Sequence, residues 1–271
     1  MKISISYPPI LNDQGQKAMV SQNRNVQFFK KPTYLLPVVQ AQAATKLKYY
    51  GFNVIWDDGN ADLKTYDEWY NDVIREQPDV IFFEGTTPVM HFLWELSKDI
   101  KRDLPNSILL IGGYHAMRQP QETLLKSEFD IVIKSTNVDF VLLELCKELK
   151  SKNLSFDEIE TKGITYRKKN SRDDIIDNGS FKMVENLDSS EIIDRNLVKW
   201  KNYAFENGNF LQTPGTYASS VIRDCMFGKC TFCRYNGPEL SFSKMSIKKS
   251  VDEYENLIIN HGVKEIFDDS G

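Results

Sequence analysis

The sequence predicts a doubly wound α/β domain in its first 150 residues, followed by the opening of a βα barrel. Three observations support this prediction. Predicted strands alternate with predicted helices from residue 2 to about residue 150. Several of these strands are continuous apolar runs, which is typical of a parallel sheet covered by helices on both faces. After residue 215, a strand, a cysteine-rich loop, a helix and a second strand follow one another.

The composition is that of a soluble globular protein. The chain has 271 residues, 41% of them hydrophobic and 27% charged, and its net charge is −4. It contains no Lys/Arg-rich block, so a nucleic-acid partner has no electrostatic support. The N-terminal apolar run is too short for a signal peptide, and no run approaches the roughly 18 to 20 apolar residues of a membrane helix. We therefore expect a cytoplasmic protein with reduced thiols and neither a membrane nor a nucleic-acid partner.

Five strands and the helices between them are predicted in the first 150 residues. The strands cover residues 2–9, 52–59, 79–85, 107–113 and 129–135. The helices are predicted over 35–51, over a segment opened by a Thr65/Glu68 capping box, over the stripe Val89, Leu93, Leu96 and Ile100, and over 121–126 and 137–150. In such folds ligands bind beyond the carboxyl ends of the strands.

Small and hydroxyl-bearing residues follow two of the predicted strands and would let a large flat ligand approach the backbone. They are Glu84, Gly85, Thr86 and Thr87 after one strand, and Gly112, Gly113, Tyr114 and His115 after the next. Ordinary turn chemistry also favours Gly and Thr at such places. No G-x-G-x-x-G or G-x4-G-K-[ST] motif is present, which disfavours a dinucleotide and excludes a P-loop. Cys146 lies on the apolar stripe of its helix and is expected to be a buried, inert thiol.

The remaining residues divide into a middle segment and a C-terminal unit. Residues 151–215 are predicted to be a linker with a short helix and a hairpin at Asp177-Asn178-Gly179. A strand over 216–224, a helix over 246–262 with Ser246 as its N-cap, and a strand over 263–269 follow. We expect the apolar face of this helix to stay uncovered. That face consists of Ile247, Val251, Tyr254 and Ile258.

Three of the four cysteines lie within one short loop. Cys225, Cys230 and Cys233 are spaced C-x4-C-x2-C. Three thiolates can hold three irons of a cubane cluster and leave the fourth iron open. A structural zinc site requires four closed ligands, and no second C-x2-C or H-x3-H motif is present. The open cluster is the favoured interpretation, and a zinc site and three unliganded thiols are the alternatives.

Two parts of the sequence resemble a known family of enzymes. The segment "RDCMFGKCTFC" after a strand, followed by "SIKKSVDEYENLIINHGVKEIFDDS", resembles the radical S-adenosylmethionine enzymes. The segments "IGGYHAMRQPQETLLKSEFDIVIKS" and "DFVLLELCKEL" resemble the cobalamin-binding subfamily of these enzymes. The resemblance implies a flavodoxin-like or Rossmann-like cobalamin-binding domain over residues 1–150. It also implies that residues 216–271 are the N-terminal, truncated part of a radical S-adenosylmethionine barrel.

The resemblance also implies cofactors and site residues. Cys225, Cys230 and Cys233 would ligate a 4Fe–4S cluster, whose open iron would bind S-adenosylmethionine and lead to a 5′-deoxyadenosyl radical. Phe232 would lie near the adenine. A reductant such as ferredoxin or flavodoxin would supply the electron, and the substrate would be a small molecule or a peptide. The corrin would contact the residues after the two strands, which are Glu84, Gly85, Thr86, Thr87, Gly112, Gly113, Tyr114 and His115.

The implied function is that of a cobalamin-dependent radical S-adenosylmethionine enzyme, with methyl transfer to an unactivated carbon as the leading reaction. Ring-forming or rearranging chemistry and a non-catalytic cobalamin-binding module are the alternatives. A complete barrel of eight βα units takes about 250 residues, and two strands are predicted after residue 215. We therefore expect the chain to be either a fragment of a longer enzyme or a truncated gene product, and we expect it alone not to cleave S-adenosylmethionine at an enzymatic rate.

The sequence departs from the family pattern in three places. The commonest cysteine spacing in the family is C-x3-C-x2-C, and the loop around Gly228 has one residue more. No D-x-H-x-x-G motif is present, so the sequence offers no histidine as the lower ligand of cobalt. Ser135-Thr136-Asn137-Val138 stands where many relatives have Gly-Glu-Gly-Glu, which affects one part of the implied cofactor contact.

Overall fold

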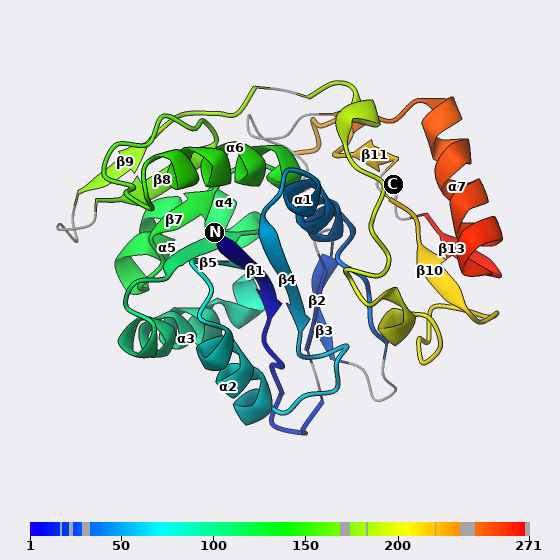
Figure 1. Ribbon diagram of the computed structural model, residues 1–271, viewed down its shortest axis with the longest axis horizontal. Coiled ribbons are helices and arrows are strands. Elements are labelled where there is room, and N and C mark those ends of the chain that lie inside the picture. Colours follow the sequence, from blue (N-terminus) through cyan, green and yellow to red (C-terminus); the bar gives the residue numbers. More distant parts are fainter. Residues whose placement is uncertain are drawn as a thin grey trace.

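The computed structural model is built around one seven-stranded sheet (Figure 1). It describes residues 1–16, 18–21, 24–28, 33–168, 174–182, 184–219, 221–233 and 242–268. The strand order is β4-β1-β5-β6-β7-β8-β9, and the first five strands are parallel. The strands are β1 (Lys2–Tyr7), β4 (Asn53–Asp58), β5 (Val80–Glu84), β6 (Ile108–Gly112), β7 (Ile131–Ile133), β8 (Ile164–Arg167) and β9 (Ile175–Asp177). The predicted five-stranded parallel sheet is therefore confirmed, and two antiparallel strands extend it.

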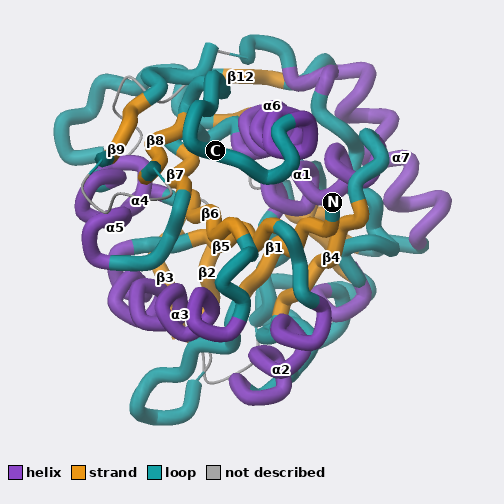
Figure 2. The backbone as a smooth tube through the Cα atoms, turned by 60° about the vertical axis from the view of Figure 1, so that its left-hand side comes forward, coloured by secondary structure: helices purple, strands orange, loops and turns teal. Residues whose placement is uncertain are grey.

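Helices cover both faces of the sheet, as Figure 2 shows. On one face, α1 (Val38–Tyr49) and α6 (Val138–Ser151) pack in the same core as Val80 and Phe82 of β5. On the other face, α2 (Tyr66–Glu76), α3 (Met90–Asp103) and α5 (Pro120–Lys126) pack with Ile81 and Phe83 of the same strand. Successive residues of a strand point to opposite faces. Because apolar cores cover both faces, neighbouring residues of the strand are both buried, which explains the continuous apolar run over residues 80–83 of β5.

The helix ends follow the predicted local signals. Thr65 Oγ1 accepts a hydrogen bond from Glu68 N (3.2 Å), and Thr65 N donates to Glu68 Oε2 (2.8 Å), which is the predicted capping box. Ser246 Oγ accepts from Lys249 N (3.3 Å) at the start of α7 (Ile247–His261). Gly262 ends α7 in the left-handed conformation with a φ of 64°.

The middle of the chain contributes to the sheet, and its hairpin differs from the prediction. β8 and β9 form the hairpin, so Asp177 ends the second strand and the predicted turn at Asp177-Asn178-Gly179 follows it. Asn178 N still donates to Ile164 O (3.0 Å), and Gly163 N donates to Gly179 O (3.0 Å). The residues of the predicted turn therefore continue the ladder beside β8, and the position predicted for the hairpin turn was wrong. Two 3₁₀ helices follow, η2 (Leu187–Ser189) and η3 (Trp200–Tyr203).

The C-terminal unit has the predicted strand–helix–strand arrangement. β10 (Gly215–Tyr217) pairs in parallel with β13 (Glu265–Phe267), and α7 lies between them in the sequence. The prediction of one strand over 216–224 was wrong, because the chain forms β10 and then β11 (Ile222–Arg223), which pairs antiparallel with β12 (Ser243–Lys244). The break falls at Ser219, whose N (3.1 Å) and Oγ (2.8 Å) donate to Glu253 Oε1 of α7 instead of to a neighbouring strand.

A hairpin that was not predicted from the sequence lies near one of the strand ends. It consists of β2 (Ala18–Ser21) and β3 (Arg24–Phe28). β3 contacts η1 (Thr87–Val89), which follows β5, and Thr33 forms an isolated bridge with Asn207. The hairpin is therefore close to the carboxyl edge at which a ligand was predicted. No helix in the part of the chain that the structure describes is long and apolar enough to cross a membrane.

Three of the four residues of the predicted apolar face of α7 are exposed, and the fourth, Tyr254, is partly buried. The exposed fractions are 84% for Ile247, 45% for Val251 and 55% for Ile258. The residues of α7 that are buried are Glu253 and Leu257. Figure 1 shows α7 with β10 and β13 at the side of the molecule opposite β8 and β9.

A fully buried ion pair fixes α7 to the strands beside it. Arg195 Nη2 donates to Glu253 Oε1 at 2.7 Å, and both side chains are 0% exposed. Arg195 Nη1 also donates to Thr216 Oγ1 of β10 (3.2 Å). Burial lowers the pKa of Arg195 from its ordinary value, and the nearby Glu253 opposes that shift. Through this pair, Arg195 of the middle segment is joined both to β10 and to α7.

Glu253→Ala is expected to lower the free energy of unfolding by about 3 to 5 kcal/mol, because it leaves a buried guanidinium without its counter-charge. The double variant Arg195→Met/Glu253→Leu removes both charges, and its free energy of unfolding is expected to be much closer to that of the wild type. Urea unfolding of the three chains measures both differences. A single variant as stable as the double variant would contradict the burial of this pair.

Candidate cofactor site

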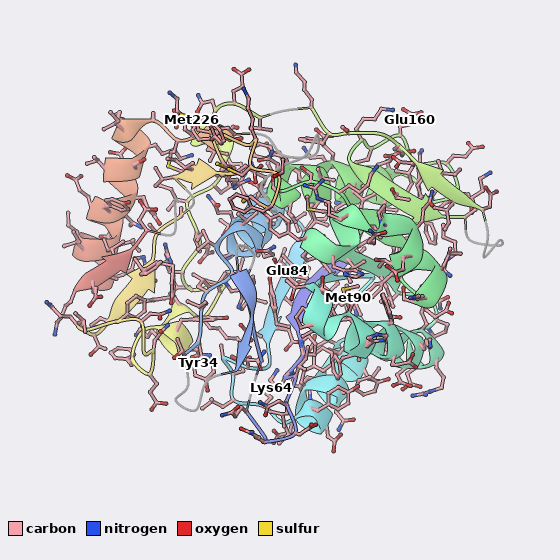
Figure 3. The ribbon with its side chains drawn as sticks, turned by 180° about the vertical axis from the view of Figure 1, so that it is seen from behind. Tyr34, Lys64, Glu84, Met90, Glu160 and Met226 are labelled. Carbon is pink, nitrogen blue, oxygen red and sulfur yellow. The ribbon has the colours of Figure 1, made fainter. Side chains whose placement is uncertain are left out.

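The carboxyl ends of β5 and β6 lie side by side and bring the two predicted segments together. Glu84 at the end of β5 is opposite Gly112 at the end of β6, and Gly85 N donates to Gly112 O (3.0 Å). Glu84 is 3% exposed, and its Oε2 accepts a hydrogen bond from Tyr7 Oη (2.8 Å) of β1. Figure 3 labels Glu84 in the interior of the molecule and Met226, which lies in the cysteine loop, near its periphery.

Gly85 and Gly113 are needed by the packing of the protein itself. Gly113 has a φ of 95°, and a Cβ atom there would overlap the carbonyl oxygen of Gly85. A Cβ atom on Gly85 would lie 2.5 Å from Met90 Sδ and 3.0 Å from Leu93 Cδ1. A bulky residue at Gly113 would thus disturb the strand ends whether or not a ligand binds. The contact of these glycines with a corrin stays a prediction.

Hydroxyl and imidazole groups surround these strand ends. Thr87 is exposed, and its Oγ1 lies 3.1 Å from His115 Nδ1. Tyr114 and His115, predicted as part of a loop, begin the short helix α4 (Tyr114–Arg118) directly after Gly113. The side chain of His115 is 12% exposed, and its Nε2 lies 3.8 Å from Glu122 Oε2. Burial lowers the pKa of His115 from its ordinary value, which favours the neutral imidazole.

Two buried polar atoms at this edge suit a polar ligand. Within the described ranges, Thr86 Oγ1 and His115 Nε2 are buried and have no hydrogen-bond partner. A buried polar group without a partner is costly, and such groups are rare in proteins. A ligand with hydrogen-bonding groups, such as the amide-bearing corrin of cobalamin, would satisfy them. The donor and acceptor chemistry of this edge therefore fits the implied cofactor.

The two aspartates at the end of β4 have a structural role. Asp58 is buried and accepts hydrogen bonds from Tyr203 Oη (2.7 Å), Asn60 N (3.0 Å) and Ala61 N (3.1 Å). Lys64 Nζ lies 3.0 Å from Asp57 Oδ1. Burial raises the pKa of Asp58 to about 6, although the hydrogen bond from Tyr203 opposes this shift. Tyr203 belongs to η3, so the segment predicted as a linker closes this end of β4.

The cysteine loop is accessible and begins at β11. Cys225 is exposed, Cys230 and Cys233 are partly exposed, and Cys233 N donates to Cys230 O (3.0 Å). Gly228 has a φ of 55°, a conformation that glycine adopts at little cost. Phe232, which the resemblance implies near an adenine, is 91% exposed. By contrast, Cys146 is buried in α6, and burial raises its pKa, which agrees with the predicted inert thiol.

The thiols are suitable donors but do not form a finished ligand set in the structure. Among the residues it describes, no three His, Cys, Asp or Glu side chains are arranged to hold a metal ion. The four cysteines form no disulfide. Soft thiolates are the ligands that iron–sulfur clusters use. By donor chemistry the loop fits such a cluster, and the ligand assignment stays a prediction.

Contacts before Cys225 join the cysteine loop to the carboxyl edge of the sheet. Thr136 Oγ1, just beyond β7, donates to Asp224 Oδ2 (2.6 Å). Arg223 Nη1 donates to Asp139 Oδ1 (2.5 Å) in the first turn of α6. Arg223 and Asp139 were not predicted to have a role, because 84 residues separate them in the sequence. The structure therefore brings the start of the loop to the same edge that carries the predicted ligand residues.

Solved structures share this fold over nearly the whole chain. The cobalamin-dependent S-adenosylmethionine radical enzyme OxsB, with aqua-cobalamin bound, has a TM-score of 0.70 and 17% identity, covering 99% of this chain and 34% of OxsB. The radical S-adenosylmethionine methyltransferase TsrM from Kitasatospora setae, with cobalamin and a [4Fe-4S] cluster bound, has a TM-score of 0.65 and 13% identity, covering 99% of this chain and 49% of TsrM. At these identities the likeness establishes the fold. The resemblance predicted from the sequence is confirmed at that level.

Curated proteins are also similar in sequence. An anaerobic magnesium-protoporphyrin IX monomethyl ester cyclase of Cereibacter sphaeroides is 26% identical over 222 residues, which are 82% of this chain and 34% of that protein. An uncharacterized methyltransferase of Pyrococcus horikoshii is 23% identical over 214 residues, which are 77% of this chain and 43% of that protein. The chain thus spans between a third and a half of the length of these relatives. No protein-family model matches the chain.

Asp58→Asn is expected to flatten the dependence of stability on pH between about pH 4 and pH 6. The raised pKa means that folded Asp58 holds its proton in this window while the unfolded chain has lost it, so wild-type stability falls as pH rises from 4 to 6. Asn removes the buried charge and keeps one oxygen, which can accept from Asn60 N and Ala61 N, but it loses the acceptor for Tyr203 Oη. The lost hydrogen bond lowers the stability of the variant by a similar amount at every pH, so the flattened slope is the diagnostic result. Urea unfolding at several pH values measures this, and parallel curves for the two proteins would contradict it.

Anaerobic reconstitution with iron and sulfide is expected to give about four irons per chain, with three thiolates as ligands. Replacing Cys225, Cys230 and Cys233 by Ala is expected to abolish this uptake, whereas Cys146→Ala, which removes a buried thiol, should leave it unchanged. Iron and sulfide analysis measures the outcome. Iron uptake that persists in the triple variant would refute the assignment of these cysteines.

Proposed function

We propose that the chain is the cofactor-binding part of a cobalamin-dependent radical S-adenosylmethionine enzyme. The observation that supports this most directly is the meeting of two features at one edge of the sheet. A loop with three cysteines begins beside β7, and the polar ends of β5 and β6 lie on the same edge. OxsB and TsrM share this fold over 99% of the chain.

The proposed roles follow the chemistry of the side chains. Cys225, Cys230 and Cys233 hold a 4Fe–4S cluster, and Phe232 lies near the adenine of S-adenosylmethionine. Thr86, Thr87 and His115 face the corrin from the ends of β5 and β6. Together the cofactors supply radical generation and one-carbon chemistry when bound. A reductant such as ferredoxin or flavodoxin provides the electron, and the cytoplasm provides the reducing conditions that keep the thiols available.

Methyl transfer to an unactivated carbon is the leading reaction. TsrM and the Pyrococcus horikoshii relative are both methyltransferases by name, which supports this choice. The Cereibacter sphaeroides relative is a cyclase by name, so ring formation is the second candidate. A module that only binds cobalamin is the third candidate, and in such a module the cysteine loop would not need to bind a cluster.

Binding of hydroxocobalamin tests the location of the corrin site. Thr87→Trp puts a bulky side chain at an exposed position beyond β5, and it is expected to weaken binding at least tenfold by blocking the edge, whereas Gly113 variants would disturb the fold. Asn106→Trp puts the same bulk at an exposed position at the opposite edge, before β6, and is the matched control. Spectrophotometric titration measures both, and equal affinities of the two variants would refute the location.

The cobalt(II) form of the bound cofactor is expected to lack nitrogen hyperfine splitting from an imidazole. The sequence has no D-x-H-x-x-G motif, so it offers no histidine as the lower ligand of cobalt. Electron paramagnetic resonance of the reduced complex makes this measurement. A histidine signal that disappears in His115→Ala would show that this imidazole ligates cobalt, contrary to the proposal.

A further inference from the structure

Arg223, two residues before Cys225, is buried against the sheet domain. It is 4% exposed, and it makes a two-pronged ion pair with Asp139 of α6, whose side chain is 0% exposed. The distances are 2.5 Å from Nη1 to Oδ1 and 3.2 Å from Nη2 to Oδ2. A guanidinium held through both prongs by one carboxylate has a defined orientation as well as a defined position.

Three further residues contact the same guanidinium. Nη1 donates to Asn137 Oδ1 (3.3 Å), and Nη2 donates to Gln42 Oε1 of α1 (2.9 Å) and to Ser190 Oγ (3.3 Å). Ser190 Oγ in turn donates to Asp139 Oδ2 (3.0 Å). The residue before the loop is thus held by α1, by the start of α6 and by the middle segment at once.

Asp224, directly before Cys225, is held at a second point. Its Oδ2 accepts the hydrogen bond from Thr136 Oγ1 at 2.6 Å, and Thr136 is 5% exposed. Asp224 has a φ of 62°, in the left-handed region that costs a non-glycine residue about 1 to 2 kcal/mol. The surrounding contacts must therefore hold this conformation, which sets the direction in which the cysteine loop leaves β11.

We infer that Thr136, Asn137 and Asp139, together with Arg223 and Asp224, form a clamp that positions the cysteine loop against the carboxyl edge of the sheet. The inference rests on the proposed function, because the loop has this significance only if its thiols hold a cluster. The clamp explains what the Ser135-Thr136-Asn137-Val138 segment does in this chain, where many relatives have Gly-Glu-Gly-Glu. Its side chains bind the approach to Cys225 and act as positioning residues.

A need for such a clamp follows from the arrangement of the proposed sites. The corrin residues lie on β5 and β6 of the sheet, and the thiols lie on a loop outside that sheet. Only contacts between the two can fix their separation, and a misplacement of about 1 Å between reacting groups can cost about 10²-fold in rate. Arg223 and Asp224 provide these contacts within two residues of the first thiol.

Thr136→Val and Arg223→Lys test the clamp in the whole chain. Thr136→Val keeps the shape of the side chain but removes the hydrogen bond to Asp224. Thr123→Val is its matched control, because it removes a buried hydroxyl that donates within α5 to Gln119 O (2.8 Å). Glu253→Gln is the control for Arg223→Lys, since it perturbs the other buried ion pair, at Arg195.

Amide hydrogen exchange of residues 222–233 in the cluster-free chain is the first measurement. Thr136→Val is expected to raise exchange there about tenfold, the size expected for one hydrogen bond to a carboxylate. Thr123→Val should leave exchange in this segment unchanged, even when its thermal midpoint is the same as that of Thr136→Val. After reconstitution, both clamp variants should lose iron to a chelator several-fold faster than their controls, and the signal of the reduced cluster should differ from the wild type.

Two results would overturn the clamp. The first is an amide exchange rate in residues 222–233 of Thr136→Val that equals the wild-type rate. The second is an equally unchanged rate in Arg223→Lys, provided that this variant folds. If Arg223→Lys does not fold, Thr136→Val decides alone, because it removes a single hydrogen bond. A wild-type chain that takes up no iron would refute the proposed cluster instead, and the exchange result would stand independently of it.

Discussion

The relation between the sheet and the cysteine loop depends on one buried guanidinium. Arg223 is buried and donates hydrogen bonds to four side chains, which are those of Asp139, Asn137, Gln42 and Ser190. The first of the three loop cysteines follows two residues later. Burying an ion pair is costly, because both charges lose their hydration. Such a pair is therefore weak evidence for stability. The pair instead defines the orientation of the Arg223 side chain, because the N–H donors of the planar guanidinium have a fixed geometry that their acceptors must match.

The residues between the two parts of the fold contribute most of the remaining polar links. Arg195 pairs with Glu253 of α7, Ser190 donates to Asp139 of α6, and Tyr203 donates to Asp58 at the end of β4. All three come from a segment that reads as a polar linker in the sequence. In the structure this segment is packed between the sheet and the C-terminal strand–helix–strand unit, so it fixes how the two meet.

The carboxyl edge of the sheet combines close packing with buried polar atoms that lack partners. Neither Gly85 nor Gly113 has room for a Cβ atom, because Gly113 lies against the carbonyl oxygen of Gly85, and Gly85 lies against the side chains of Met90 and Leu93. Thr86 Oγ1 and His115 Nε2 lie beside this contact, and they have no hydrogen-bond partner among the described groups. A rigid backbone with unsatisfied polar atoms is pre-organised for a ligand that can hydrogen-bond to it.

The sequence alone determined the elements whose signals are local. Apolar runs fixed β1, β4, β5, β6 and β7, the Thr65/Glu68 pair fixed the start of α2, and the cysteine spacing identified the loop. Only the tertiary structure decided the features that depend on distant residues. It put β8 and β9 into the sheet, broke the strand over 216–224 at Ser219, and joined Arg223 to Asp139 across 84 residues. Periodicity and capping report the conformation of neighbours in the chain, whereas a buried ion pair forms only when separate segments have already been brought together.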